Sequence, residues 1–412
     1  MTNPRGPYFI SYRRTEQRTF EAVLVRDALR NRGVPTWRDL DDLKSSSTET
    51  ELIKTLQDEN LAGAVMLIAP EVESSTMIRN AEAPRIFARN NLADGFSIHP
   101  ILIGVGYGDA DRILNHPAGF QDLGDWNLYK LENKELNYED SRSIAKRVLT
   151  HRLKTIIEKE SDSTPNIGLY SRRAPGASNA DILHDFSVYF NGRQCDRGTY
   201  GLAQEAMEDS ASAIAQTYGS INLTCSGLAS LPMGILFGAI YSPLAEFNVT
   251  WMQGIAGQEK EAWSHSIGRS DIRASIRRHL SDPGSDDLIV GIGVSANIEP
   301  LVTTFLRKTG LRPRASIYSE PEKGPMAQGI SLSPSDGIAI VLDTLDAIRN
   351  AKDDLQLKRP TIHVFLACPL SMAVLIGQKL NTFSEVVLYE HRPDLDIGYE
   401  EVHRFNPSGF SY

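Results

Sequence analysis

Glu82 is the residue of the first half of the chain whose type and position point most directly to chemistry. It follows a short apolar run at residues 64–69, whose length is typical of a strand buried on both faces of a sheet. A carboxylate about a dozen residues after such a strand is expected at the carboxyl edge of a parallel sheet, where open α/β sheets bind their ligands. The alternative is an ordinary glutamate on the surface of a helix.

The elements around Glu82 are predicted to alternate between strands and helices. Buried strands are predicted at residues 8–12, 34–37, 64–69 and 98–103. A helix is predicted before Gly33, with Phe20, Val23, Leu24 and Ala28 on its inner face, and further helices are predicted at 48–56 and 138–158. This alternation predicts a parallel sheet with right-handed crossovers.

Four segments, in their order along the chain, resemble a bacterial TIR domain. They are Phe9-Ile10-Ser11-Tyr12, Trp37-Arg38-Asp39, residues 65–70 and residues 75–82, and the resemblance covers roughly residues 6 to 155. It implies a flavodoxin-like parallel sheet and, in enzymatic members, a glutamate six or seven residues after a serine that cleaves the nicotinamide–ribose bond of NAD. Glu82 is the matching position and is therefore the expected catalytic residue.

The sequence departs from the TIR pattern at two places near this glutamate. Met77-Ile78 stands where family members often carry Trp-Cys. Pro84 disfavours helical geometry at Ala83, so a helix is expected to begin or kink there, which leaves the orientation of Glu82 open.

The chemistry that the resemblance implies suits a lone carboxylate. Nicotinamide is a cationic leaving group, so its departure needs no general acid, and the transition state is oxocarbenium-like, as in glycoside hydrolysis. A carboxylate beside the ribose stabilises that charge. Arg79 or Arg85 is expected to favour the ionised form of Glu82. NAD+ is thus expected as the substrate, and no cofactor is expected.

The TIR resemblance also places an NAD site at the ends of the first two strands. The residues expected to bind NAD are Phe9, Ser11, Tyr12, Arg13, Trp37 and Asp39. Phe9 and Tyr12 would stack on nicotinamide or adenine, and Arg13 would hold the pyrophosphate together with Arg38. The alternatives are aromatic rings packed in the core and arginines in solvent.

A polar segment at residues 159–166 has the composition of a linker, and the pattern of buried strand and helix then appears twice more. Strands are predicted at 186–190, at 221–225 ending in a Ser226-Gly227 turn, and at 247–252, 287–295, 314–318, 361–367 and 385–390. Helices are predicted at 200–218, 231–240, 298–308, 336–350 and 372–380. We therefore expect a first domain at residues 6–158 and two Rossmann-like halves at about 167–285 and 286–412.

The C-terminal segment, residues 167–412, resembles a SAVED domain. The resemblance is carried by the string at residues 362–374, by Ile376-Gly377 and by Val387-Leu388-Tyr389-Glu390. It implies two fused CARF-like halves that bind a cyclic oligonucleotide in bacterial antiphage signalling. A TIR domain joined to such a sensor resembles an effector of CBASS, activated by a cyclic tri- or dinucleotide.

Turns of small residues that open a helix expose backbone N–H groups, which can bind phosphate. On this basis the residues expected to bind the cyclic nucleotide are Ser226, Gly227, Ser295, Pro369, Leu370 and Ser371, with Trp251 and Tyr389 as stacking partners of the bases. Arg269, Arg273, Arg277 and Arg278 are predicted on one helix, either as a phosphate or protomer contact or as a solvated face. Ordinary turns and core packing are the alternatives for the first group.

The composition excludes several classes of protein. With 412 residues, 41% of them hydrophobic, and a net charge of −9, the chain has room for two or three domains and is not built to bind long nucleic acids. Its 3 cysteines and 9 histidines show no metal-ligand spacing, so we expect no metal. No apolar run reaches the roughly 18 residues of a membrane span, and no signal peptide is visible, so we expect a cytoplasmic protein with no membrane partner.

Together these features predict an antiphage NAD+ glycohydrolase that is switched on when a cyclic oligonucleotide binds the C-terminal domain and drives self-association. The loop at residues 39–47 of a neighbouring copy would then complete the cleft around Glu82. A non-enzymatic TIR adaptor, assembled by the same ligand, is the alternative. A catalytic Rossmann enzyme in the C-terminal part is disfavoured, because that part shows no paired His/carboxylate or Ser/His constellation.

Overall fold

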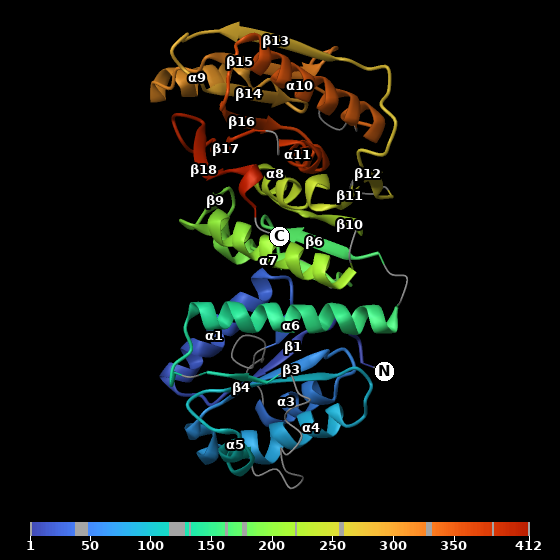
Figure 1. Ribbon diagram of the computed structural model, residues 1–412, viewed down its shortest axis with the longest axis vertical. Helices are drawn as coiled ribbons and strands as arrows, with labels where there is room; N and C mark the ends of the chain where they lie inside the picture. The colour runs from blue at the N-terminus through green and yellow to red at the C-terminus, as the bar shows by residue number, and fades with distance from the viewer. Residues whose placement is uncertain are drawn as a thin grey trace. The chain divides into compact units, whose positions relative to one another are not determined.

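The chain divides into two units in the computed structural model (Figure 1). The first contains Met1–Ser163 and Ala177–His184, and the second contains Thr164–Gly176 and Asp185–Tyr412. The structure describes residues 2–37, 48–114, 128–131, 133–160, 164–174, 179–218, 221–254, 259–326, 332–380 and 383–410. Strand β7 (Ile182–Asp185) carries the chain from the returning segment of the first unit into the second.

The first unit is built on a parallel sheet with the strand order β2-β1-β3-β4-β5. Its strands are β1 (Tyr8–Ser11), β2 (Thr36–Trp37), β3 (Gly63–Ile68), β4 (Ser97–Leu102) and β5 (Tyr129–Lys130). β1 and β3 are neighbours, although β2 lies between them in the sequence, so the strand order reverses at β1. Open α/β sheets bind ligands at the carboxyl ends of the strands that flank such a reversal.

Helices cover both faces of this sheet, as Figure 1 shows: α1 and α6 lie on one side, and α3, α4 and α5 on the other. Their bounds are α1 (Glu16–Asn31), α3 (Thr48–Gln57), α4 (Ala83–Asn90), α5 (Tyr107–Leu114) and α6 (Tyr138–Lys159). Asn137 begins α6 with a capping box that involves Asp140. The predicted parallel arrangement of strands and helices is therefore present in this unit.

The inner face of α1 differs from the prediction. Phe20 is 57% exposed and Val23 and Leu24 are half-buried; of the predicted residues only Ala28 is buried, together with Ala22, Val25 and Leu29. The helix is rotated because it also buries an ion pair, Arg18 Nη1 to Glu21 Oε2 at 2.6 Å, on its inner side. A buried, paired charge overrides the simple apolar spacing that the sequence suggested.

The second unit contains two larger sheets, one from each half. The first has the order β12-β11-β10-β6, and the second has the order β13-β15-β14-β16-β17-β18. The first is made of β6 (Asn166–Tyr170), β10 (Ile221–Leu228), β11 (Phe247–Gln253) and β12 (Glu261–Trp263). The second is made of β13 (Ala274–Leu280), β14 (Leu288–Gly293), β15 (Ala315–Pro321), β16 (Thr361–Ala367), β17 (Glu385–His391) and β18 (Tyr399–Phe405).

The inner strands of both sheets are parallel, whereas the edge strands β12, β13 and β18 are antiparallel to their neighbours. A short hairpin, β8 (Phe190–Asn191) and β9 (Gln194–Cys195), lies apart from the two sheets. The helices of this unit are α7 (Thr199–Tyr218), α8 (Leu231–Ile240), α9 (Glu299–Thr309), α10 (Pro334–Asp354) and α11 (Leu370–Gly377). In each half, then, parallel strands direct their carboxyl ends to one edge of a sheet.

The two halves join where α8 packs against α11 (Figure 1). A Cβ atom on Gly238 would lie 2.0 Å from the carbonyl oxygen of Val374, and one on Gly377 would lie 2.2 Å from that of Ile235. Glycine at both positions lets the two backbones touch. Both helices are buried almost all round, which is why their sequences are apolar without a polar face.

Four sequence predictions are wrong in this unit. Residues 186–190 form a 3-10 turn, Ser187–Tyr189, before β8 rather than one strand, because Phe186 turns inward to the core. β10 runs on through Ser226 and Gly227, which are therefore not a turn. Leu370 and Ser371 belong to the first turn of α11.

The fourth wrong prediction concerns the arginine-rich segment, which is the edge strand β13 and not a helix. Its side chains alternate along the strand and find carboxylate partners: Arg277 pairs with Glu299 at 2.9 Å and also with Glu320, and Arg278 pairs with Asp354 at 2.7 Å. Arg269 precedes the strand and pairs with Asp343 at 2.8 Å. These arginines already have partners within the chain, and β13 pairs with β15 of the second half although it precedes residue 286.

Across the described ranges, no helix is both long enough and apolar enough to cross a bilayer.

Candidate functional site

The first candidate site lies at the carboxyl end of β1, where Ser11 donates a hydrogen bond to Glu82 (Oγ to Oε2, 2.6 Å). Both residues are buried, and Glu82 is 6% exposed. Since β1 and β3 flank the point where the strand order reverses, the carboxylate occupies the edge of the sheet at which such folds bind ligands. The contact fixes the direction of the carboxylate, which the sequence had left open.

A single π-helical turn, Ile78–Glu82, presents this carboxylate. The backbone N–H of Ala83 donates to the carbonyl of Ile78, and α4 then begins at Ala83 with Pro84 in its first turn. Helical residues precede Pro84, so the N–H that it lacks interrupts the hydrogen-bond ladder, and the wider π-turn lies directly before this interruption. The sequence predicts a helix start or a kink at Pro84: α4 does begin next to it, at Ala83, but Ala83 is itself helical (φ −55°, ψ −47°), contrary to the expectation that the proline would disfavour this. π-turns of this kind often occur at functional sites.

The two arginines near Glu82 bind backbone carbonyls. Arg79 Nη1 donates to the carbonyl of Glu73 at 3.1 Å, and Arg85 Nη1 donates to that of Ala81 at 2.8 Å. Ser11 is a side-chain partner of Glu82, and ionisation of Glu82 through these arginines stays a prediction.

The remaining residues predicted to bind NAD are placed as follows. Phe9 is 1% exposed and stacks on Trp37 with ring centroids 5.3 Å apart, inside the core between the sheet and α3 to α5. Tyr12 is buried and Arg13 half-buried, directly after β1. Asp39, Arg38 and the loop at 39–47 lie outside the described residues. The structure therefore brings Ser11 to Glu82, and it places Phe9 in the core with the half-buried Trp37 packed against that core.

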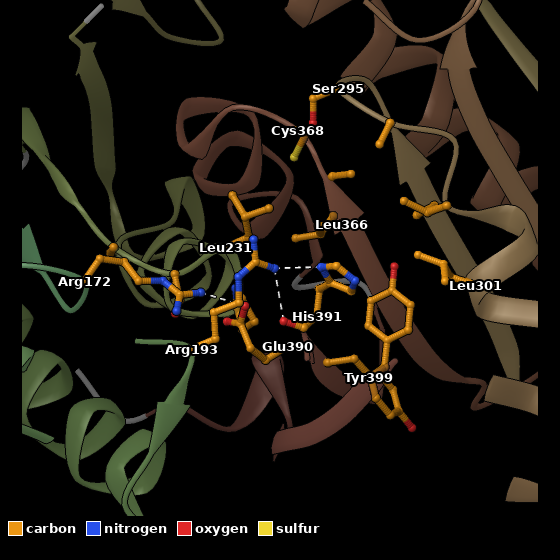
Figure 2. Close-up of a pocket in the computed structure, with 17 residues that line it drawn as sticks. Arg172, Arg193, Leu231, Ser295, Leu301, Leu366, Cys368, Glu390, His391 and Tyr399 are labelled. Carbon is orange, nitrogen blue, oxygen red and sulfur yellow. Dashed lines mark hydrogen bonds and ion pairs between the residues drawn. The ribbon is translucent and has the colours of Figure 1, made fainter. Parts of the chain in front are cut away.

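The second candidate site is a cavity of about 460 Å³ in the second unit (Figure 2). Its wall is made of residues at the carboxyl ends of five parallel strands: Arg172 after β6, Ser230 after β10, Ser295 after β14, Cys368 after β16, and Tyr389 to His391 at the end of β17. The cavity is therefore built by both halves at once, at the edge where each sheet would bind a ligand.

Apolar and helical groups complete this cavity. Leu231 and Pro232, in the first turn of α8, line it together with Ile298 and Leu301 at the start of α9. Ser230 caps α8 by accepting a hydrogen bond from the N–H of Met233, and its hydroxyl also contacts the Tyr200 hydroxyl at 2.8 Å. The positive end of the α8 dipole thus faces the cavity, which favours an anion there.

Two arginines supply the positive charge of the cavity. Arg172 Nη2 donates to Glu390 Oε1 at 2.6 Å, and Arg193 Nη1 donates to the ring Nδ1 of His391 at 2.7 Å, as the dashed lines in Figure 2 show. Arg172 also donates to the carbonyl of Gly192, at the tip of the β8–β9 hairpin. The hairpin is thereby linked to the carboxyl end of β17 twice, through Arg172, which bonds both Gly192 and Glu390, and through Arg193, which bonds His391.

Burial shifts the pKa values of the titratable groups in the cavity wall. It raises the pKa of the Glu390 carboxyl, although Arg172 acts in the opposite direction. It lowers the pKa of His391, and the charge of Arg193 lowers it further. Burial also raises the pKa of Tyr399 to about 12. At neutral pH His391 is therefore a neutral acceptor for Arg193.

The structure brings together only part of the predicted nucleotide site. Ser295 and Tyr389 line the cavity, whereas Trp251 is 1% exposed and packs edge-on against Phe237 in the core. Ser226 and Gly227 lie within β10, because Gly227 lets β6 come close: a Cβ there would lie 1.9 Å from the carbonyl oxygen of Leu169.

At the start of α11 the cavity is lined by Cys368, the residue just before the predicted Pro369, Leu370 and Ser371. Pro369 caps α11, and Leu370 and Ser371 enter its first turn, where they are buried. The Ser371 N–H donates to Gln253 Oε1 at 3.2 Å.

The sequence reasoning missed Arg172, Arg193, Ser230, Glu390 and His391 as wall residues of the cavity. A signal existed for Arg193, because Asn191-Gly192 before it is a typical hairpin turn. Arg172 follows a short strand, Asn166–Tyr170, that the sequence analysis had not recognised.

Comparison with known families identifies a large part of the second unit. Residues 206–405 match the family model of SAVED, described as "SMODS-associated and fused to various effectors sensor domain". This segment is therefore a SAVED domain, which confirms the resemblance stated for residues 167–412 over the matched range. Arg172 and Arg193 precede the matched range. Among curated proteins, a search found no match.

Solved structures similar to the chain are Cap4 SAVED/CARF-domain containing receptors. The receptor of Acinetobacter baumannii with the cyclic trinucleotide 3′3′3′-cAAA is 13% identical, with a TM-score of 0.49 over 88% of this chain and 86% of that one. The receptor of Moraxella osloensis is 14% identical, with a TM-score of 0.43 over 88% and 86%.

Proposed function

We propose that this chain is a ligand-gated NAD+ glycohydrolase of antiphage signalling. Its SAVED domain binds a cyclic di- or trinucleotide, and binding switches on cleavage of NAD+ at Glu82 in the first unit. The observation that carries the sensor part is the cavity at the carboxyl ends of β6, β10, β14, β16 and β17, with Arg172 and Arg193 in its wall.

The cavity has the chemistry that a compact nucleotide anion requires. Its volume of about 460 Å³ lies within the range of small-molecule sites. Two guanidinium groups and the N-terminus of α8 favour phosphates. Leucine and isoleucine side chains on α8 and α9 offer apolar surface to the faces of bases. A family whose members are sensors fused to effectors agrees with this assignment.

The proposal for NAD+ rests on Glu82 and on the residues that resemble a TIR domain. The strand order β2-β1-β3-β4-β5 is that of flavodoxin-like sheets, which supports the resemblance. In the proposed reaction the bond between ribose C1′ and the nicotinamide nitrogen breaks, and its electron pair leaves with nicotinamide. The carboxylate of Glu82 stabilises the positive charge that develops on the ribose. Water then attacks C1′ and loses a proton, which gives ADP-ribose.

Ser11 has a positioning role in this proposal. Its hydroxyl donates to Glu82 Oε2 at 2.6 Å. Because the two oxygens belong to one planar carboxylate, this bond also sets the direction of Oε1. A carboxylate fixed in this way loses little orientation entropy when the substrate binds.

Coupling between sensor and enzyme requires that the ligand bind one state of the protein better than another. We propose that the preferred state is a self-associated one, in which copies of the chain join head to tail. An open contact of that type produces filaments.

The test is an assay of NAD+ loss in the presence of a panel of cyclic di- and trinucleotides. The expected result is that at least one cyclic nucleotide binds in the micromolar range or tighter and starts NAD+ consumption. Glu82→Gln is expected to bind the same ligand with unchanged Kd and to lose NAD+ cleavage by about 1,000-fold or more, since the variant removes the stabilising charge.

Two results would overturn parts of the proposal. Full NAD+ cleavage by Glu82→Gln would remove the catalytic role of that residue. Ligand-induced assembly, seen by light scattering, without NAD+ loss in the wild type would instead support a non-enzymatic adaptor.

A further inference from the structure

Glu390 is an unexpected residue for a cavity that attracts anions. It is the single carboxylate among the 17 residues that line the cavity, and it lies in β17 beside Tyr389 and His391. Glu390 is 4% exposed, so its charge is largely withdrawn from water. A buried carboxylate opposes the binding of a phosphate unless it has a role of its own.

The two oxygens of this carboxylate have different surroundings. Oε1 accepts the short hydrogen bond from Arg172 Nη2. Oε2 is buried and has no hydrogen-bond partner among the described residues. Figure 2 shows the carboxylate between Arg172 and the side chains of Arg193 and His391, which contact each other.

A buried acceptor without a partner is costly, and a charged one more so. Arg172 neutralises the charge of Glu390 but leaves Oε2, a buried atom of a residue that lines the cavity, without a donor in the part of the chain that the structure describes. The neighbouring Arg193 is bound to the ring and the carbonyl of His391 and does not satisfy it. The site is therefore prepared for a donor that the ligand brings.

We propose that Glu390 selects the nucleobase of the cyclic oligonucleotide, with Oε2 accepting a hydrogen bond from the exocyclic amine of adenine or cytosine. This inference rests on the proposed sensor function and assigns a specificity-determining residue to its cavity. Arg172 has two tasks: it holds Oε1 and presents Oε2 to the base.

The geometry separates the four bases. Uracil has carbonyl oxygens on both sides of its one ring N–H, and these would meet the negative oxygen. Guanine also has an exocyclic amine, but its ring N–H lies beside this amine and would have to share Oε1 with Arg172, which already donates to that oxygen. Adenine and cytosine each bring one amine, which matches one open acceptor.

The first experiment uses the wild-type chain and changes only the ligand. Kd is measured by calorimetry for cyclic triadenylate, for its analogue with purine riboside in place of adenosine, and for the cyclic trimers of C, G and U. Removal of the amine is expected to weaken binding by about 10- to 100-fold, the range for a hydrogen bond to a charged group. Equal affinity for the adenosine and purine riboside ligands would overturn the proposal, as would a preference for the cyclic trimer of G or U.

The second experiment tests whether Glu390 is the group that accepts a hydrogen bond from the amine. In Glu390→Gln the ratio of Kd values between the two ligands is expected to fall to about threefold or less, because an amide oxygen is a weaker acceptor than a carboxylate. Affinity for the amine-free ligand is expected to stay the same or rise, since a negative charge leaves the cavity. An unchanged ratio would exclude Glu390 as the reader.

A matched control lies on the same strand. Glu385 begins β17 and pairs with Arg404 at 2.8 Å, at the opposite end of the strand from the cavity. Glu385→Gln also breaks an Arg–Glu pair and is expected to leave the ratio unchanged. If no cyclic trimer or dimer binds the wild type, the sensor function itself fails, and this inference falls with it.

Discussion

The contact between Ser11 and Glu82 joins two residues that are 71 positions apart in the sequence. β1 ends at Ser11, and the π-turn ends at Glu82, so the contact depends on the neighbouring positions of β1 and β3 in the sheet. A hydroxyl that donates to a buried carboxylate both satisfies the charge and fixes its rotamer. This pairing makes Ser11 a testable positioning residue.

Ser11→Ala removes that hydroxyl while it leaves Glu82 in place. We expect kcat for NAD+ cleavage in the activated protein to fall by about tenfold, because the carboxylate loses a charge-assisted hydrogen bond that holds it. KM is expected to change little. The measurement is steady-state NAD+ consumption at saturating cyclic nucleotide.

Ser74→Ala provides the comparison, because Ser74 is exposed and its hydroxyl donates to the carbonyl of Glu71. This variant is expected to keep wild-type kcat. The orienting role is wrong if Ser11→Ala also keeps wild-type kcat. It is also wrong if Ser11→Thr, which retains a hydroxyl, loses as much activity as Ser11→Ala.

The sequence predicts the two sites unequally at the residue level. The position of Glu82 at the edge of the sheet could be predicted, because a local order of segments surrounds it, whereas its catalytic role stays a prediction. The wall of the second cavity could not be predicted in this way. Arg172 follows the short strand β6 and Arg193 lies at the tip of the β8–β9 hairpin, and these two segments meet only in the folded unit. Trp251 shows the reverse error: an aromatic residue in a strand was expected to stack on a base, but it packs in the core.

Among the elements, α8 and α11 have the strictest packing requirement. At Gly238 of α8 and Gly377 of α11 the backbone of the other helix is so close that a Cβ atom would overlap with it. The two helices begin beside the cavity, so their spacing also sets the positions of Ser230 and Cys368. Glycine is therefore needed here for contact between helices and not for a turn.

Gly377→Ala is expected to destabilise the second unit by about 3 kcal/mol, because the new methyl group would lie 2.2 Å from the carbonyl oxygen of Ile235 and backbone must move. The corresponding fall in Tm is about 6–12 °C. Differential scanning calorimetry of the full chain measures it.

Gly201→Ala is the matched variant. Gly201 lies exposed in α7, and a Cβ there would meet nothing within 4 Å. It is expected to raise stability by about 0.5–1 kcal/mol through helix propensity. Equal effects of the two substitutions would show that the α8–α11 contact is not restrictive.

Elements with a continuous apolar run were predicted well, and those with a mixed pattern were not. β14, β16 and β17 are inner parallel strands, and each reads as a buried run. β13 and β18 are edge strands that contain adjacent charged residues, Arg277-Arg278 and Glu400-Glu401, and neither reads as an apolar run; the sequence predicts a helix where β13 lies. Edge strands owe their pairing to a neighbour that the local sequence does not reveal.

At the scale of the whole molecule, both candidate sites follow one rule. Each lies at the carboxyl ends of parallel strands, in the first unit beside a reversal of strand order and in the second unit where two sheets contribute together. The general class of fold could therefore be predicted from alternating strands and helices. The assembly of one cavity from two halves could not, since it depends on the α8–α11 contact.

Buried histidines make the stability of the whole chain depend on pH. Burial lowers the pKa of His99 to about 3 and the pKa values of His184 and His403 to about 4, from an ordinary value of 6.5. Between about pH 6.5 and 4 the unfolded chain binds protons at these sites and the folded chain does not. Their contribution to stability is thus complete above pH 6.5 and is lost as the pH falls towards 4.

This loss is expected to reach about 1 kcal/mol per pH unit for each of these histidines. His403→Gln tests one of them, because the His403 ring contacts Gln204 Oε1 at 2.8 Å and a glutamine amide can donate there instead. The free energy of unfolding of the second unit is measured by denaturant titration at pH 7.5, 6.0 and 5.0 in the wild type and the variant. As the pH falls, it should decrease by about 1 kcal/mol per pH unit less in the variant than in the wild type. Identical slopes in the two proteins would mean that His403 is protonated in the folded state as readily as in the unfolded one, and that its burial does not control this part of the acid sensitivity.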